Sequence, residues 1–241
     1  MRVLPILFNT DMVRSILDGR KTVTRRVLKN LPKDAEYVGQ LEDSFDLWDE
    51  KDIGKSMFKT SLLPTEKAGC IFIKPPYQTG DILYVRETWQ ECCRNTIHSQ
   101  IVHNKYCFKA SVDNPIYGCI DRECGQICNW KPSIHMPKEA ARIWLKVTDV
   151  RVERLQEITP VEVVKEGAYE DCRECLESYG ESRTQCCYKQ DDECSQCDSV
   201  IMEFERLWNS TIKKSNLDRY GWDANPWVWV IEFERCEKPE K

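Results

Sequence analysis

The stretch RIWLKVTDVRVERLQEITPVEVVKEG, residues 142–167, decides the fold of this chain. Apolar and polar residues alternate from Arg142 to Leu155, which predicts one long strand with Ile143, Leu145 and Val147 on a shared face. A helix signal follows this strand at once.

The helix signal after this strand is the clearest in the chain. Thr159–Glu162 is a capping box with proline at the first helical position. Ile158 and Val163 stand where a hydrophobic staple would place them. Gly167 is suited to end the helix.

The chain before this stretch begins with a short strand and a short helix. Residues 3–8 form an apolar run that predicts a strand, and residues 11–18 predict a helix with Thr10 as its cap and Gly19 as its end. The segment GRKTVTRRVLK, residues 19–29, is expected to turn into a second strand.

Further strand signals outnumber the helix signals. Strands are predicted at Asp81–Trp89, Lys105–Ala110 and Trp227–Arg235, and one more helix at about 199–208. Residues 30–78 are mixed and polar, and they are interpreted as an insertion or long loop region. The pattern favours an α+β fold that is mainly β, a small β-barrel with short helices, over a doubly wound sheet.

Composition limits the function classes. The chain has 241 residues, 35 of them basic and 40 acidic, for a net charge of -5. This charge argues against coating nucleic acid by electrostatics alone, although a local basic groove is compatible with it. The first residues lack the cleavage site of a signal peptide, and no apolar run reaches membrane-spanning length. We therefore expect a cytoplasmic protein without a membrane partner.

Cysteines form the most specific cluster in the second half of the chain. Fourteen cysteines in a reducing compartment favour metal ligation or free thiols over disulfides. Two C-x2-C pairs separated by 18 residues predict a structural zinc site. Its expected ligands are Cys172, Cys175, Cys194 and Cys197, with Cys186 or Cys187 as possible replacements. The competing interpretation is a set of reduced surface thiols.

A second cysteine group is weaker, because its spacings match no strong metal-binding template. Free or buried cysteines are favoured here over a second metal. The group comprises Cys119, Cys124 and Cys128, with Cys92, Cys93, Cys107 or His135 as a fourth ligand.

The basic segment Gly19–Arg25 lies at the mouth of a predicted strand, where loops commonly carry function. An ordinary solvated basic turn is the competing interpretation. Here ILDGRKTVTRR, residues 16–26, resembles the G-x-K-x-x-T/E-x-R signature of ASCH domains. The resemblance extends to the G-D-x-L entry at Gly80–Leu83, to the capped helix ending at Glu166, and to the final strand VIEFER, residues 230–235.

The segments WKPSIHMPKEAARI and NPWVWVIEFER also look like a larger subgroup of ASCH-like proteins common in phages and prophages. The resemblance implies a PUA-like barrel over residues 1–167 and 198–241. Residues 30–78 and 90–128 would be insertions in it, and residues 168–197 a cysteine-rich zinc-binding insertion.

The resemblance also implies a cleft for RNA or a nucleotide. Small bacterial ASCH members are amidohydrolases that remove acyl groups from N4-acylated cytidines, and their catalytic roles fall here on Lys21, Thr24 and Glu166. In a regular strand Lys21 and Thr24 would face opposite sides, so Lys21 must precede the strand for the pair to meet.

This chemistry is physically consistent. A threonine hydroxyl needs a base, and a lysine serves if burial or neighbouring cations lower its pKa. Arg20, Arg25 and Arg26 are such neighbours in sequence. Glu166 stands at a helix C-terminus, where the dipole disfavours a carboxylate and assists its protonation; the competing interpretation is a frayed, exposed helix end.

Further ligand-binding candidates lie in a proline-rich loop and one strand. Trp130, with Lys131 and His135 beside it, could stack on a base, although a core anchor is the favoured interpretation of Trp130. His135 is equally consistent with a structural histidine or a metal ligand. Arg86 is expected on the same barrel face, and Arg20 and Arg25 complete the set of candidate ligand contacts.

The leading hypothesis is an ASCH-like protein that holds a nucleoside or nucleic-acid base, with hydrolysis of an N4-acylated cytidine as its enzymatic form. One alternative is a non-catalytic module that binds RNA or modified nucleic acid. Another is a phage adaptor whose zinc-binding insertion contacts a protein partner.

Overall fold

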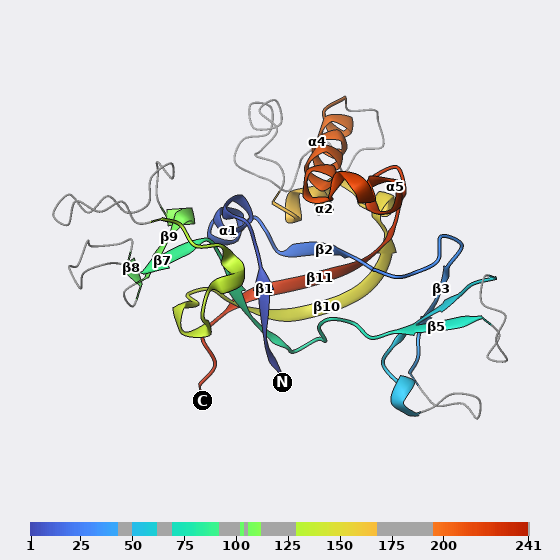
Figure 1. Cartoon of the computed structure of the whole chain (residues 1–241), viewed down its shortest axis with the longest axis horizontal. Coiled ribbons are helices and arrows are strands. Elements are labelled where there is room, and N and C mark those ends of the chain that lie inside the picture. Colours follow the sequence, from blue (N-terminus) through green and yellow to red (C-terminus); the bar gives the residue numbers. More distant parts are fainter. Residues whose placement is uncertain are drawn as a thin grey trace.

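A computed structural model describes residues 1–42, 50–61, 69–91, 102–103, 106–111, 129–167 and 195–240. The strands within these ranges form three sheets, and the helices are mostly short (Figure 1). The expectation of an α+β fold that is mainly β is therefore confirmed. None of the described helices is long and apolar enough to cross a membrane.

The main sheet has five strands. Their order is β1 (Val3–Leu7), β6 (Ile82–Arg86), β10 (Trp144–Arg154), β11 (Trp227–Cys236) and β2 (Val23–Val27). Only β1 and β6 are parallel. Among the described residues the edge strands β1 and β2 do not pair with each other, so the sheet is open and no closed barrel is present.

A second sheet occupies part of the region that the sequence suggests is a loop. It contains β3 (Glu36–Gln40), β4 (Ser56–Lys59) and β5 (Cys70–Ile73), at one end of the main sheet (Figure 1). The alternative of a long loop at 30–78 is therefore wrong, and the interpretation of this region as an insertion stays a prediction. These strands are short, and Phe58 and Tyr37 pack against Trp227, with ring centres 5.9 Å from it. These ring contacts join residues far apart in the sequence, so no local pattern of residues predicts the strands.

A third sheet lies at the opposite end of the main sheet (Figure 1). It consists of β7 (Trp89–Glu91), β9 (Tyr106–Phe108) and β8 (Val102–His103). The single strand predicted at Asp81–Trp89 is divided between β6 and β7. Glu87 lies at the division, where its carboxylate is buried in an ion pair with Arg142 at 2.9 Å.

The helices follow their capping signals closely. α1 (Thr10–Leu17) is capped by Asn9, whose side chain accepts from the N–H of Met12 at 2.8 Å, so Thr10 is the first helical residue and not the cap. α2 (Pro160–Lys165) begins with the predicted capping box. α4 (Ser195–Thr211) is longer than predicted. The remaining helices are α5 (Leu217–Tyr220) and the 3-10 turns η1 (Glu50–Asp52), η2 (Lys109–Ser111), η3 (Ser133–His135), η4 (Lys138–Ala140), η5 (Leu155–Glu157) and η7 (Lys214–Asn216).

The main sheet buries both of its faces. Along β11, Ile231 and Phe233 join the cluster that contains Phe8 and the apolar side of α1. Val228 and Val230 join a second cluster with residues of α2 and α4. Since β2 is an edge strand beside β11, its residues also divide between these clusters, and this division sets the surroundings of the candidate site.

Candidate functional site

Lys21 lies in the segment between α1 and β2, outside the regular strand. Its backbone N–H donates to the carbonyl of Ser15 at 2.9 Å, which ties it to the end of α1. The placement meets the geometric condition derived from the sequence, because a residue before the strand is not bound to the strand's alternation. The whole residue is 2% exposed.

The ammonium group of Lys21 has three close acceptors. They are the carbonyl of Val23 at 2.7 Å, the carbonyl of Glu166 at 2.8 Å and the Glu166 carboxylate at 2.7 Å. Lysine has three N–H donors, so the structure uses all of them.

The Val23 carbonyl needs such a donor because of its position in the sheet. The carbonyl of Thr22 accepts from Phe233 in β11, so the next carbonyl along β2 points away from β11. β2 is an edge strand, so no described strand of the sheet lies on that side. Lys21 therefore supplies the hydrogen bond that a neighbouring strand would otherwise donate to the Val23 carbonyl.

The electrostatics of Lys21 favour its neutral form more than those of an ordinary lysine do. Burial lowers the pKa of Lys21, the Glu166 carboxylate opposes this effect, and the cations Arg26 and Arg25 lower it further. The net direction is downward from the ordinary value. This is the direction that the sequence predicts from burial and neighbouring cations.

Glu166 is the C-terminal cap of α2 and is 7% exposed. Its N–H donates to the carbonyl of Glu162 at 2.8 Å, so the interpretation as a frayed, exposed helix end is wrong. Gly167 follows with φ at 73°, and its carbonyl accepts from the Ser15 hydroxyl at 3.1 Å. The ends of α1 and α2 therefore meet beside Lys21.

Arg25 is 4% exposed and faces carboxylates, although the sequence suggests a ligand contact. Its guanidinium lies 3.1 Å from Glu153, 3.1 Å from Glu162 and 3.5 Å from Glu166. Arg151 joins the same group through Glu162 at 2.9 Å. These interactions tie α2 to the main sheet.

Three members of this charged group were not predicted from the sequence as site residues. They are Arg151, Glu153 and Glu162. A signal was available, because Asp149, Arg151 and Glu153 alternate with apolar residues along β10 and so share one face of the strand. Their arginine partner comes from β2, which no local pattern indicates.

Thr24 lies in β2 opposite Ile231 and is 1% exposed. Cross-strand partners share a face, so Thr24 faces the cluster that contains Ile231 and Phe8. The Lys21 ammonium lies 5.6 Å from the centre of the Phe8 ring. The structure thus brings Lys21 and Glu166 into direct contact, and Thr24 faces the hydrophobic cluster that contains Phe8, near which the Lys21 ammonium also lies. Among the described contacts, Thr24 forms no hydrogen bond with Lys21 or with Glu166.

The other candidate ligand residues form a separate group at the third sheet. Lys131 pairs with Trp89 through the backbone, and its ammonium lies 4.9 Å from the Trp89 ring centre. Arg86 donates to the carbonyl of Ile134 at 3.2 Å, next to His135 in η3. Trp130 precedes Lys131 and is half-buried.

The two groups are adjacent through the backbone of Phe8, whose N–H donates to the carbonyl of Arg86 at 3.1 Å. Two buried donors at the third sheet, Nε of Arg86 and Nε1 of Trp89, have no hydrogen-bond partner among the described residues. Arg20 belongs to neither group and pairs with Asp18 at 3.1 Å.

The predicted zinc ligands cannot be placed. Cys172, Cys175 and Cys194 lie outside the described residues, and Cys197 lies in the part of α4 where only the backbone is described. The described ranges contain no group of three or more potential ligands. Cys107 is disulfide-bonded, so it is not a thiolate ligand and departs from the expectation of free or metal-bound cysteines.

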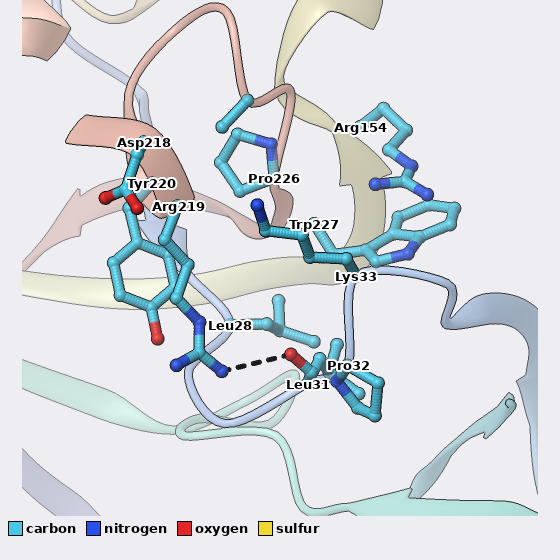
Figure 2. A pocket seen from close by; sticks show the side chains of 11 residues that line it. Leu28, Leu31, Pro32, Lys33, Arg154, Asp218, Arg219, Tyr220, Pro226 and Trp227 are labelled. Carbon is cyan, nitrogen blue, oxygen red and sulfur yellow. Dashed lines mark hydrogen bonds between the residues drawn. The ribbon is translucent and has the colours of Figure 1, made fainter. Parts of the chain in front are cut away.

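A pocket of about 130 Å³ lies at the other end of β2 and β11 (Figure 2). Arg154, Arg219 and Trp227 are among its lining residues. Trp227 packs against the core and also forms part of the pocket wall.

Comparisons of the chain with family models, with curated proteins and with solved structures give no match. A function can therefore be proposed only from the geometry of the described residues and from the resemblance in sequence.

Proposed function

We propose that this chain is an ASCH-like protein with a PUA-like fold that binds a nucleoside and hydrolyses the amide of an N4-acylated cytidine. The observation that best supports the proposal is the 2.7 Å contact between Lys21 and Glu166, which are 145 residues apart in sequence. These are two of the three residues that carry the family's catalytic roles in the sequence resemblance.

The first step of the proposed reaction forms an ester. The Thr24 oxygen attacks the acyl carbon, and the hydroxyl proton passes to the neutral amine of Lys21. The lowered pKa of Lys21 supports this role because it increases the fraction of neutral amine. When the carbon–nitrogen bond breaks, the leaving N4 nitrogen takes up a proton.

Glu166 is suited to handle that proton. Its carboxylate lies within hydrogen-bond distance of the Lys21 nitrogen, so a proton can move from Lys21 to Glu166 and on to the leaving nitrogen. A water molecule then hydrolyses the threonine ester. The balance is one N4-acylcytidine and one water consumed, with one cytidine and one carboxylic acid released.

Nucleoside binding and the stability of the cysteine-rich segment involve other residues. Arg86, Trp130, Lys131 and His135, which lie beside the third sheet, would contact the nucleoside. A structural zinc held by thiolates of the cysteine-rich segment would stabilise that segment, and this ligation requires a reducing compartment such as the cytoplasm.

The second candidate function is a non-catalytic module that binds a nucleoside or RNA. One observation favours it: all three donors of Lys21 are engaged and Thr24 is 1% exposed, an arrangement that a purely structural ion pair would also produce. This alternative predicts affinity without turnover.

The test is turnover of N4-acetylcytidine by the purified full chain. Wild type is compared with Thr24→Val, which replaces the hydroxyl by a methyl group, and with Thr22→Val, a matched control at an exposed position two residues away. Cytidine release that persists in the control and disappears in Thr24→Val supports the hydrolase.

Absence of turnover from folded wild type would exclude the hydrolase. Titration of the same protein with cytidine and with a short RNA would then test the binding module. Equal turnover by Thr24→Val and wild type would also rule out the proposed nucleophile.

A further inference from the structure

The pocket at the far end of β2 and β11 is built from three separate parts of the chain. Arg219 and Tyr220 come from α5 on one side of the view, and Arg154 and Trp227 lie on the other, with Lys33 between them (Figure 2). The remaining lining residues are Leu28, Leu31, Pro32, Asp218, Ala224 and Pro226.

The pocket carries an excess of positive charge. Lys33, Arg154 and Arg219 face one carboxylate, that of Asp218, so the lining has a net charge of about +2 at neutral pH. Within the described part of the chain none of these three cations forms a salt bridge, whereas Lys21 and Arg25 both do. In a chain with a net charge of -5, three such cations around one cavity are unusual.

Arg154 is held in position by neutral partners. Its guanidinium lies 4.1 Å from the centre of the Trp227 ring and donates to the carbonyl of Asn225 at 3.0 Å. The Trp227 indole is fixed in turn by donating to the carbonyl of Ala35 at 2.8 Å. Burial lowers the pKa of Arg154, and Glu157 opposes this effect.

Arg219 is oriented in a similar way. It donates to the carbonyl of Leu31 at 3.2 Å (Figure 2) and lies 5.3 Å from the Tyr220 ring centre. A guanidinium has five N–H donors, so each arginine keeps donors available after these bonds are made. Two pre-positioned guanidinium groups and an ammonium around one cavity are the donor set that recognises phosphate.

We propose that this pocket binds the phosphate group of a small phosphorylated ligand. A phosphate monoester is largely a dianion at pH 7 and matches the net charge of the lining, which a singly charged carboxylate does not. The volume of about 130 Å³ admits the phosphate and a small part of the ligand. Leu28, Pro32 and Pro226 offer apolar surface to the rest.

This site goes beyond the proposed hydrolase. Val23 contacts Lys21 and Leu28 lines the pocket, and five residues of extended chain span about 17 Å. One nucleoside therefore does not fill both places. The phosphate can come from inorganic phosphate or from a mononucleotide, and the two sources are distinguished by measurement.

The experiment is calorimetric titration of the full chain with inorganic phosphate and with cytidine 5′-monophosphate. The variants are Lys33→Gln and Arg219→Gln, at exposed positions where folding should be retained. Their matched controls are Lys29→Gln and Arg206→Gln, which are outside the pocket lining. Asp218→Asn removes the one negative charge of the lining.

We expect both probes to bind competitively. Each pocket variant should weaken them about tenfold, the controls should leave them unchanged, and Asp218→Asn should strengthen them. Tighter binding of the nucleotide than of phosphate would identify a mononucleotide as the source, and equal binding would identify phosphate itself. No saturable binding up to about 10 mM, or binding indifferent to Lys33 and Arg219, would overturn the proposal whatever the result with N4-acetylcytidine.

Discussion

The nitrogen of Lys21 lies 2.7 Å from the carboxylate of Glu166 in a place where both side chains are almost free of solvent. The pair joins the open edge of the main sheet to the end of α2, and it also unites two residues of the proposed catalytic set. Stability and activity can therefore be tested with the same positions.

Replacing Glu166 by glutamine should destabilise the fold. The change leaves the buried Lys21 ammonium without its closest carboxylate, and removal of one member of a buried pair typically costs about 3 kcal/mol. Urea unfolding at pH 7 measures the loss. Glu203→Gln is the matched control, since Glu203 pairs with Arg206 on an exposed helix surface and should lose less than about 1 kcal/mol. Equal losses for the two variants would contradict a buried, energetically important pair.

Gly167→Ala should be more damaging than Gly19→Ala. Both glycines end a helix with positive φ, 73° and 76°, so alanine is strained by about 1 kcal/mol at either position. At Gly167 the new Cβ would also lie 2.6 Å from Cβ of Ser15, whereas at Gly19 no described atom lies within 4 Å. Overpacking should add about 2 kcal/mol to the loss for Gly167→Ala. Thermal unfolding of both variants checks the difference, and similar melting temperatures would show that α1 and α2 do not meet as described.

Asp81→Asn should weaken the fold at neutral pH and not at acid pH. Burial raises the pKa of Asp81, but hydrogen bonds from Arg2 and from the N–H of Gln78 outweigh it, and the net pKa is lowered. A carboxylate with a lowered folded-state pKa contributes stability above its unfolded pKa of about 3.9 and loses it as pH falls through the folded value.

For this variant we expect a loss of about 2 kcal/mol at pH 7 that decreases as pH falls below about 3.9, the unfolded pKa, and vanishes once pH is below the folded pKa. Urea unfolding at several pH values measures it, with Asp11→Asn as the control because that side chain is 89% exposed. A loss that is constant with pH would exclude the charge of Asp81 as its cause.

Arg26→Gln should move the pH profile of hydrolysis to higher pH. The proposed reaction needs neutral Lys21, so the rate rises as pH increases through the pKa of Lys21, and the positive charge of Arg26 helps to lower that pKa. Removing the charge of Arg26 raises the pKa of Lys21 and moves the rising part of the rate profile to higher pH. Rates of N4-acetylcytidine hydrolysis across pH measure the shift; an unchanged profile would mean that another group provides the base.

Purified protein should contain about one zinc ion per chain. Cys172→Ser should lower this content, because each thiolate is needed for a closed tetrahedral site. Cys236→Ser is the control, since Cys236 is a free thiol and burial raises its pKa, which makes it a poor ligand. Metal analysis by mass spectrometry decides the matter, and zinc-free protein prepared without chelators would rule out the site.

The parts of the fold that could be predicted from the sequence are those that depend on local patterns of residues. The Thr159 capping box and the alternation of β10 depend on neighbours a few residues away, and both appear in the structure. The position of Lys21 before β2 meets the condition that strand geometry sets if Lys21 and Thr24 are to lie on one side, as the family resemblance implies.

The parts that were missed depend on contacts between distant segments. The second sheet owes its core to Trp227, and Arg25 finds its carboxylates on β10 and α2. The proposed phosphate pocket combines the loop after β2 with α5 and the end of β10, so no single stretch of sequence predicts the pocket. Asn9 caps α1 in place of Thr10, in agreement with the stronger preference for asparagine than for threonine at this position.

The pairing of β2 with β11 has a consequence for folding during synthesis of the chain. β2 is made about two hundred residues before β11, its described partner in the main sheet. Closing so long a loop is slow, and until it closes both edges of β2 can pair with other chains. Until β11 has been made, chaperones that shield exposed strand edges should therefore protect β2 from pairing with other chains.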